Sequence, residues 1–269
     1  MRSAGIALRR SRWVAIAGDV GELRWCFLGR VEYGAARRLQ TRLADLRARG
    51  GIDDLVLLLE HEPVVTVGRN APLPDPRMVR DRPVVRTDRG GGVTYHGPGQ
   101  LVGYPVCRLP ARGRGVRSFV SAIEHALCDV ALSLGIAATP RRGYPGAWTG
   151  PAHAPRKLGS IGLGVRRAIT LHGFALNVDP RAERGFEGMA PCGLPGVRVT
   201  SLASLRARPL PSMETLAARL ARGVAIRTER RWVPEALDPA ELPADDGESG
   251  DGRSDGEGPA EHTRAFLLG

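Results

Sequence analysis

The segment GSIGLGVRRAITLHGFALNV, residues 159–178, decides how the centre of this chain folds. Apolar and β-branched residues recur in both halves, and the pair Arg166 and Arg167 divides them. Two such runs separated by a short polar break are typical of neighbouring strands joined by a turn. We therefore predict two strands that meet near Arg166, with His172 and Phe174 on one face of the second strand.

Apolar runs and helical periodicity predict further elements on both sides of this pair. The segment DLVLLLEHEPVVTVGR, residues 54–69, opens with a continuous apolar run, which is typical of a strand buried on both faces. Residues 118–135 carry apolar side chains three and four positions apart, which predicts an amphipathic helix. On similar grounds we expect strands at 25–31, 83–88 and 101–109 and helices at 32–50 and 212–226. Strands mixed with a few helices indicate a single α/β (α+β) domain.

The net charge of +11 is distributed unevenly along the 269 residues. Residues 234–269 hold ten acidic residues and two arginines, whereas the other 233 residues hold 37 basic and 18 acidic ones. A segment so poor in large apolar side chains cannot offset its ordering entropy, so we expect an acidic disordered tail. The predicted division is an N-terminal extension at 1–24, a folded domain at 25–233 and this tail at 234–269. The basic domain would suit a nucleic acid, an anionic membrane or an acidic protein.

Several protein classes are disfavoured by the sequence. No stretch approaches the roughly 18 uninterrupted apolar residues of a membrane span. The basic N-terminus has apolar runs that are too short and broken for a signal peptide. The four cysteines lack close pairs and form no C-x-x-C, so neither a disulfide framework nor a zinc site is expected. We expect a cytoplasmic protein.

The segment RGGGVTYHGPGQLVGY, residues 89–104, is the most unusual local sequence. Six of its sixteen residues are glycine, which lets the backbone approach a ligand closely. It is neither a phosphate-binding loop nor a dinucleotide-binding fingerprint. Side chains that can donate hydrogen bonds lie among the glycines: Arg89, Thr94, Tyr95, His96 and Gln100. The composition favours a binding loop over a structural turn.

The chain has one lysine, Lys157, among 39 basic residues. Arginine serves as well as lysine for a solvated surface cation, but it stays protonated at any working pH. A lysine retained in so arginine-rich a chain is therefore a candidate proton carrier or nucleophile. The alternative is an ordinary surface lysine that has not been replaced.

The four cysteines occupy two kinds of sequence context. Cys26, Cys107 and Cys128 lie in apolar runs and are expected to be buried and inert. Cys192 lies in the turn-rich segment APCGLPG, residues 190–196, where a thiol can be exposed in a fixed position.

A nucleophilic cysteine must be a thiolate, which a nearby cation stabilises. Lys157 and His172 are the candidate cations for Cys192. The alternatives are that Cys192 is a loop residue without a role and that His172 is a satisfied strand histidine. His61, before Pro63, either helps to line a site or caps the end of a strand.

Three blocks in this order resemble the bacterial octanoyltransferase family of lipoate biosynthesis. They are RGGGVTYHGPGQLVGY (89–104), RKLGSIGLGVRRAITLHGFALNV (156–178) and PCGLPGVRVTSL (191–202). The resemblance covers roughly residues 25–230 and identifies 25–233 as the catalytic domain. Glu62 stands where the family usually has proline, a departure that touches no catalytic role.

The resemblance implies a fold, an activity and a set of site residues. It implies a mixed sheet with flanking helices, similar to the catalytic domain of biotin and lipoate protein ligases. It implies an acyltransferase in which Cys192 carries the acyl group as a thioester and Lys157 lowers the cysteine pKa and acts as acid and base. The residues implied to surround the octanoyl group are Arg89, Gly90, Gly91, Gly92, Val93, Thr94, Tyr95, His96, Ser160, Ile161, Gly162, His172, Gly173, Phe174 and Ala175.

The resemblance also implies partners. The octanoyl donor is acyl carrier protein, and the acceptors are lipoyl domains of 2-oxoacid dehydrogenases and the glycine cleavage H protein. No cofactor and no metal is expected, because the acyl donor is already a thioester. Neither nucleic acid nor a membrane is an expected partner.

Two other functions compete with this interpretation. An ATP-dependent lipoate–protein ligase would need a nucleotide site, and the sequence has no nucleotide motif. A basic nucleic-acid-binding module would interleave aromatic with basic residues, but aromatic residues make up only 5% of the chain and do not cluster in that way.

Overall fold

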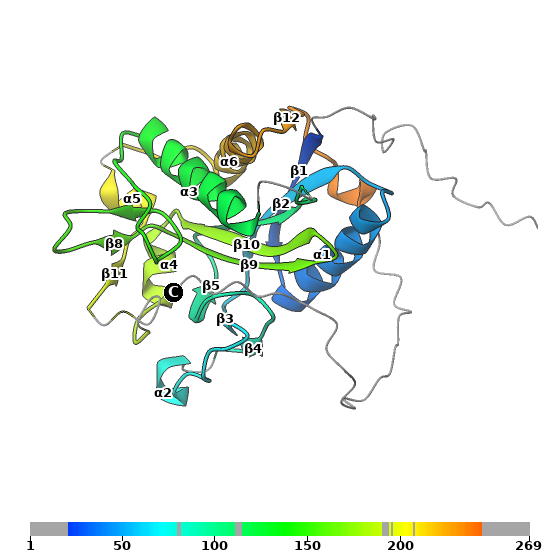
Figure 1. Cartoon of the computed structure of the whole chain (residues 1–269). Coiled ribbons are helices and arrows are strands. Elements are labelled where there is room, and N and C mark those ends of the chain that lie inside the picture. The colour runs from blue at the N-terminus through cyan, green and yellow to red at the C-terminus, as the bar shows by residue number, and fades with distance from the viewer. Residues whose placement is uncertain are drawn as a thin grey trace, which may run out of the picture.

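The computed structural model describes residues 21–79, 82–110, 115–189, 194, 196–206 and 208–243. Six strands form the central sheet: β1 (Glu22–Val31), β2 (Asp54–His61), β6 (Gln100–Val106), β9 (Gly159–Arg166), β10 (Ile169–Asn177) and β12 (Arg231–Trp232). Their order is β12-β1-β2-β6-β10-β9 (Figure 1). The first three strands in this order run parallel, and the pairs from β2 to β9 are antiparallel. The predicted mixed α/β architecture is confirmed.

Strand β2 lies inside the sheet, and its apolar run is buried on both faces. Its side chains alternate, so that Leu57 packs on the face covered by α1 (Tyr33–Ala48). Leu58 packs on the opposite face, which α3 (Val116–Ser133) and α6 (Met213–Arg227) cover (Figure 1). The continuous apolar sequence is thus explained by helices on both sides of the strand.

Strands β9 and β10 form the predicted hairpin. Their register runs from Ile169 opposite Arg166 to Leu176 opposite Gly159. The two-residue turn consists of Arg167 and Ala168, with φ of 50° and 62°. Positive φ at both central residues is the backbone of a type I′ turn, which fits the twist of paired strands.

Two three-stranded sheets and several short helices complete the described fold. The first sheet has the strands β4 (Val84–Arg86), β3 (Val64–Val67) and β5 (Val93–His96), in that order. The second has the strands β11 (Arg198–Val199), β8 (Arg156–Lys157) and β7 (Trp148–Thr149). The short helices are α2 (Pro76–Val79), α4 (Pro180–Gly185), α5 (Leu202–Leu205) and the 3₁₀ helix η3 (Pro239–Glu241).

The expected helices and strands are present, with ends shifted by a few residues. The predicted strand at 54–69 is divided into β2 and β3, because the chain turns at Glu62 and Pro63. Strand β5 lies inside the segment that we expected to be a binding loop.

The chain after β12 packs along β1. The Trp232 ring stacks on Trp25 with 5.9 Å between ring centroids, and the Leu237 amide donates to the Trp25 carbonyl over 2.8 Å. Leu237 and Leu242 are buried, so residues 234–243, which we expected to belong to the tail, pack against the domain. The expected extension up to residue 20 and the expected tail from residue 244 lie outside the described residues.

Candidate active site

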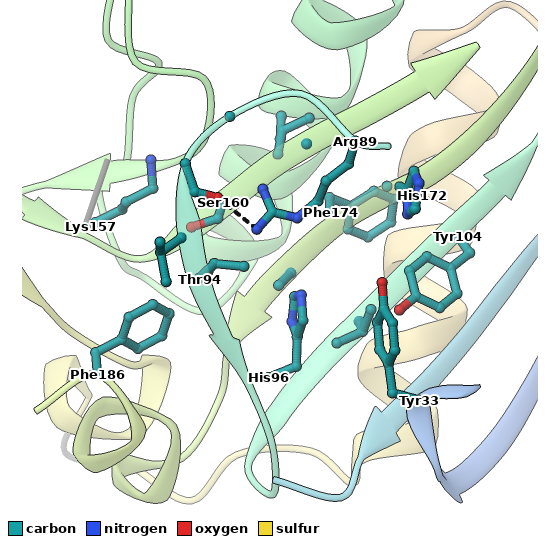
Figure 2. A pocket seen from close by; sticks show the side chains of 18 residues that line it. Tyr33, Arg89, Thr94, His96, Tyr104, Lys157, Ser160, His172, Phe174 and Phe186 are labelled. Atoms are coloured by element: carbon teal, nitrogen blue, oxygen red, sulfur yellow. Dashed lines mark hydrogen bonds between the residues drawn. The ribbon is translucent and has the colours of Figure 1, made fainter. Parts of the chain in front are cut away.

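A pocket lies between residues 89–96, which include β5, and the strands β6, β9 and β10 (Figure 2). Its walls combine glycine backbone and apolar side chains with a few polar groups. The lining residues are Tyr33, Arg89, Gly91, Gly92, Val93, Thr94, His96, Val102, Tyr104, Lys157, Ser160, Ile161, Gly162, His172, Gly173, Phe174, Ala175 and Phe186.

Arg89 fixes the glycine-rich loop from within. Its guanidinium donates to the Thr66 carbonyl over 2.8 Å and to the Thr66 hydroxyl over 3.0 Å. It also donates to the carbonyls of Gly90 and Gly92 over 3.0 and 2.7 Å. Because these bonds join the loop to β3, a segment rich in glycine has a defined shape beside the pocket.

Phe174 forms an apolar part of the pocket wall, and the position of its ring requires a glycine at residue 103. A Cβ added at Gly103 would lie 2.1 Å from Cζ of the Phe174 ring. The two residues are paired across β6 and β10, so the ring lies directly over the Gly103 backbone. A side chain at residue 103 would displace the Phe174 ring from its present position in the pocket wall.

Lys157 lies at one end of the pocket and is 2% exposed (Figure 2). Strand β8 positions it, because β8 pairs with both β7 and β11. Its Nζ donates to the Pro145 carbonyl over 3.0 Å. The retained lysine is therefore not the ordinary surface residue that was the alternative interpretation.

Cys192 lies outside the described residues, but the chain on either side of it is anchored near Lys157. Phe186, before it, lines the pocket. Val199, after it, pairs directly with Lys157, and the Thr200 amide donates to the Lys157 carbonyl over 2.9 Å.

His172 lies away from Lys157, across the pocket (Figure 2). Its φ of 55° is unusual for a buried non-glycine residue in a strand. The ring Nε2 bonds to Asp88 Oδ1 over 2.6 Å, and the backbone amide donates to Gln40 Oε1 over 3.0 Å. The His172 ring holds the pKa of Asp88 well below its usual range.

Two further histidines lie beside the pocket and are uncharged near neutral pH. His61 Nδ1 donates to the Val31 carbonyl over 2.9 Å, so in neutral imidazole Nε2 accepts from the Tyr104 hydroxyl over 2.6 Å. His96 Nδ1 bonds to Gln100 Oε1 over 2.7 Å. Burial lowers the pKa of His61 to about 4 and that of His96 to about 3.

Most of the residues that we expected to bind substrate line this one pocket, although they come from two separate sequence blocks, 89–104 and 156–178. Gly90 and Tyr95 do not line it. Successive side chains of β5 alternate, and Tyr95 packs on Phe186 with 5.8 Å between ring centroids. The lining residues absent from the expected set, besides Lys157, are Tyr33, Val102, Tyr104 and Phe186.

The other three cysteines are buried, as expected. Burial raises the pKa of Cys26 to about 12 and that of Cys128 to about 11, and it raises the pKa of Cys107 further. These thiols are not nucleophiles at neutral pH.

The fold and the pocket define a class of proteins. A family model described as "Lipoyl protein ligase A/B catalytic domain" matches residues 32–225. Among solved structures, the chain resembles a bipartite lipoate protein ligase from Thermoplasma acidophilum with a TM-score of 0.60, covering 82% of this chain and 89% of that one. At 16% identity this likeness concerns the fold alone.

Sequence relatives narrow the class. The chain is 41% identical over 216 residues to an octanoyltransferase of Geobacter metallireducens, covering 79% of this chain and 97% of that protein. It is 46% identical over 177 residues to an octanoyltransferase of Mycobacterium bovis, covering 66% of this chain and 75% of that protein. The chain therefore belongs to the octanoyltransferase family and is an acyltransferase.

Two features are absent from the part of the chain that the structure describes. No helix in that part is long and apolar enough to cross a bilayer. The same residues contain no cluster of three or more histidine, cysteine or acidic side chains that would hold a metal ion.

Proposed function

We propose that the chain transfers an octanoyl group from octanoyl-acyl carrier protein to a lysine of lipoyl domains, through a thioester on Cys192. This is the first step of endogenous protein lipoylation, and it takes place in the cytoplasm. The catalytic domain comprises residues 25–233 together with the packed segments 22–24 and 234–243. The observation that carries the proposal is Lys157, an amine that is 2% exposed at the end of a pocket walled by glycine and apolar side chains.

The pocket walls support a medium-length acyl chain as the ligand. Ile161, Phe174 and Phe186 supply apolar surface, and the glycines leave space where side chains would otherwise lie. Each buried CH₂ contributes about 0.8 kcal/mol, so the chain itself supplies much of the binding free energy. We assign Arg89 a role in shaping this wall, because its bonds hold the adjacent loop.

The first half-reaction forms the acyl-enzyme. The Cys192 thiolate attacks the carbonyl carbon of the donor thioester, with Lys157 as the neighbouring ammonium. The tetrahedral intermediate collapses, the bond to the carrier sulfur breaks, and Lys157 gives its proton to that sulfur. The products are octanoyl-Cys192, the carrier thiol and neutral Lys157.

The second half-reaction forms the amide. Neutral Lys157 takes a proton from the acceptor lysine, whose amine then attacks the Cys192 thioester. Collapse of the intermediate releases the Cys192 thiolate, and the remaining proton on the new amide nitrogen passes to water. The enzyme returns to its thiolate–ammonium state, with neither ATP nor a metal consumed.

Charge supports acidic protein partners. The part of the chain before residue 234 has 37 basic and 18 acidic residues. Such a surface speeds the encounter with an acidic carrier or acceptor domain. The Thermoplasma ligase of similar fold was solved in a study of that ligase and its E2 lipoyl domain, which supports a lipoyl domain as the acceptor. The expected acceptors are lipoyl domains of 2-oxoacid dehydrogenases and the glycine cleavage H protein.

Intact-protein mass spectrometry tests the proposal. Mixing the chain with octanoyl-acyl carrier protein should add the mass of one octanoyl group. Cys192→Ala should abolish the adduct, and the control Cys128→Ala should retain it. The proposal fails if the adduct persists without Cys192 or if no adduct forms while octanoyl transfer to a lipoyl domain proceeds.

A ligase and a transferase can be distinguished by the substrates that they use. A ligase would modify the lipoyl domain from free octanoate and ATP, without a carrier thioester. We expect no product under those conditions and full transfer when octanoyl-acyl carrier protein is the donor.

A further inference from the structure

The aromatic ring of Trp148 lies against the amine of Lys157. The two residues are paired directly across β7 and β8, and Nζ lies 4.4 Å from the ring centroid. Trp148 is 3% exposed, and its Nε1 donates to the Tyr144 carbonyl over 2.9 Å. This bond fixes the ring plane, so the contact with Lys157 does not depend on a freely rotating side chain.

The backbone before Trp148 bends around the same amine. Pro145 presents its carbonyl to Nζ over 3.0 Å. Gly146 has a φ of 139°, and a Cβ at this position would lie 2.1 Å from the Gly159 carbonyl oxygen and 3.3 Å from Nζ. The Gly146 amide donates to Glu124 Oε1 on α3 over 3.1 Å. Only glycine allows the chain to turn here, and the turn places a carbonyl dipole on Lys157.

The attractive groups around Lys157 favour its protonated form. A ring face and a backbone carbonyl both attract an ammonium more strongly than a neutral amine. Glu124 adds a carboxyl group near Lys157, although burial raises the pKa of that carboxyl.

Four arginines on the surrounding elements carry positive charge, which disfavours the protonated form of Lys157. Arg141 lies 5.4 Å from the same Trp148 ring, Arg156 and Arg198 lie on β8 and β11, and Arg89 lines the same pocket. The Trp148 ring and the Pro145 carbonyl both contact Nζ directly.

We propose that Trp148 is a positioning residue that holds Lys157 as an ammonium and directs it into the pocket. The inference rests on the proposed function, because it decides which of two roles Lys157 has in the resting enzyme. Residue 157 begins the cycle as the cation that stabilises the Cys192 thiolate. It becomes a base only after it has given its proton to the departing carrier thiol.

The single lysine makes a direct test possible. Protein labelled with ¹³C-lysine and free of lysine-containing tags gives one lysine Cε signal, whose shift reports protonation of Lys157. Replacing the ring by an apolar side chain in Trp148→Leu should lower the titration midpoint by about 0.5–1.5 pH units, since the ammonium loses its cation–π contact. Trp148→Phe retains a ring face and should recover at least about half of the shift. Equal midpoints in the wild-type and Leu chains would overturn the proposal.

A measurement on the unmodified chain covers the case in which Trp148→Leu does not fold. The ring current of Trp148 should move the Lys157 Hε resonances upfield, with cross-peaks to the indole protons. Hε shifts of a free lysine would refute the contact. Neither readout needs activity, so failure of the Trp148–Lys157 contact and failure of the acyl-enzyme experiment can be told apart.

Discussion

His61 Nε2 accepts a hydrogen bond from the Tyr104 hydroxyl over 2.6 Å, and both side chains are buried. The depressed pKa of His61, about 4, makes the stability of the fold depend on pH. As pH falls below about 6.5, His61 becomes protonated in the unfolded chain but stays neutral in the folded chain. The free energy of unfolding should therefore fall between about pH 6.5 and pH 4, by on the order of 2 kcal/mol for this group.

The change His61→Gln tests this, because glutamine can donate and accept hydrogen bonds but does not titrate. Urea unfolding at several pH values should show a flatter pH dependence in the variant. His125→Gln, at an exposed position on α3, is the control and should retain the slope. If His61→Gln has the wild-type slope, His61 is not the source of the dependence.

Lys157→Arg should reduce octanoyl transfer at least about a hundredfold, in the range for removal of a general base. Arginine retains the charge but cannot give up a proton in the first half-reaction, so it is not available as the neutral base of the second. Steady-state transfer to a lipoyl domain measures the loss. Arg156→Lys, at the exposed neighbour on β8, is the matched control and should remain within about twofold of wild type. An active Lys157→Arg chain would mean that charge alone suffices.

Alkylation should separate Cys192 from the other thiols. At neutral pH, brief iodoacetamide treatment of the native protein should modify one cysteine, Cys192, because Cys26, Cys107 and Cys128 are buried and their pKa values are raised. Unfolding in guanidinium should expose all four cysteines. Peptide mapping identifies the modified site, and rapid native labelling at any of the buried three would contradict the expectation.

One residue change in the β9–β10 turn should stabilise the fold. Ala168 has a φ of 62°, which is strained for alanine but free for glycine. Ala168→Gly should raise the free energy of unfolding by about 0.5 kcal/mol, the relief of strain less the added entropy of the unfolded chain. Ala218→Gly on α6 is the opposite case and should lower it by about 0.5–1 kcal/mol. Urea unfolding distinguishes the two, and a loss of stability in both would mean that the turn is unstrained.

The larger elements could be predicted because their patterns are long. The hairpin at 159–178, the buried run that begins β2 and the amphipathic α3 each repeat a burial pattern over several residues. Strands β7 and β8 have two residues each, which is too short for any periodicity. The strands that position Lys157 therefore could not be predicted from the sequence, although Lys157 itself could be identified as the single lysine.

The pocket could be predicted only within the segments that carry the family motifs. Tyr33 reaches it from the start of α1 and Phe186 from the residue that caps the end of α4, and no motif connects either helix to the glycine-rich segment. Tyr95 was expected at the ligand because its motif neighbours are there. Once β5 is known as a strand, alternation places Tyr95 on the face opposite to Thr94 and His96.

Because the segment after β12 packs on β1, this edge of the sheet can be completed only late in translation. Trp25 donates its indole N–H to the Pro234 carbonyl, across 209 residues of sequence. During translation, β1 is made before all the other described strands, and β12, which covers its outer edge, is made after all of them. An unpaired edge invites pairing with another nascent polypeptide. Ribosome stalling shortly before residue 231 should therefore be a point at which this protein aggregates or recruits a chaperone.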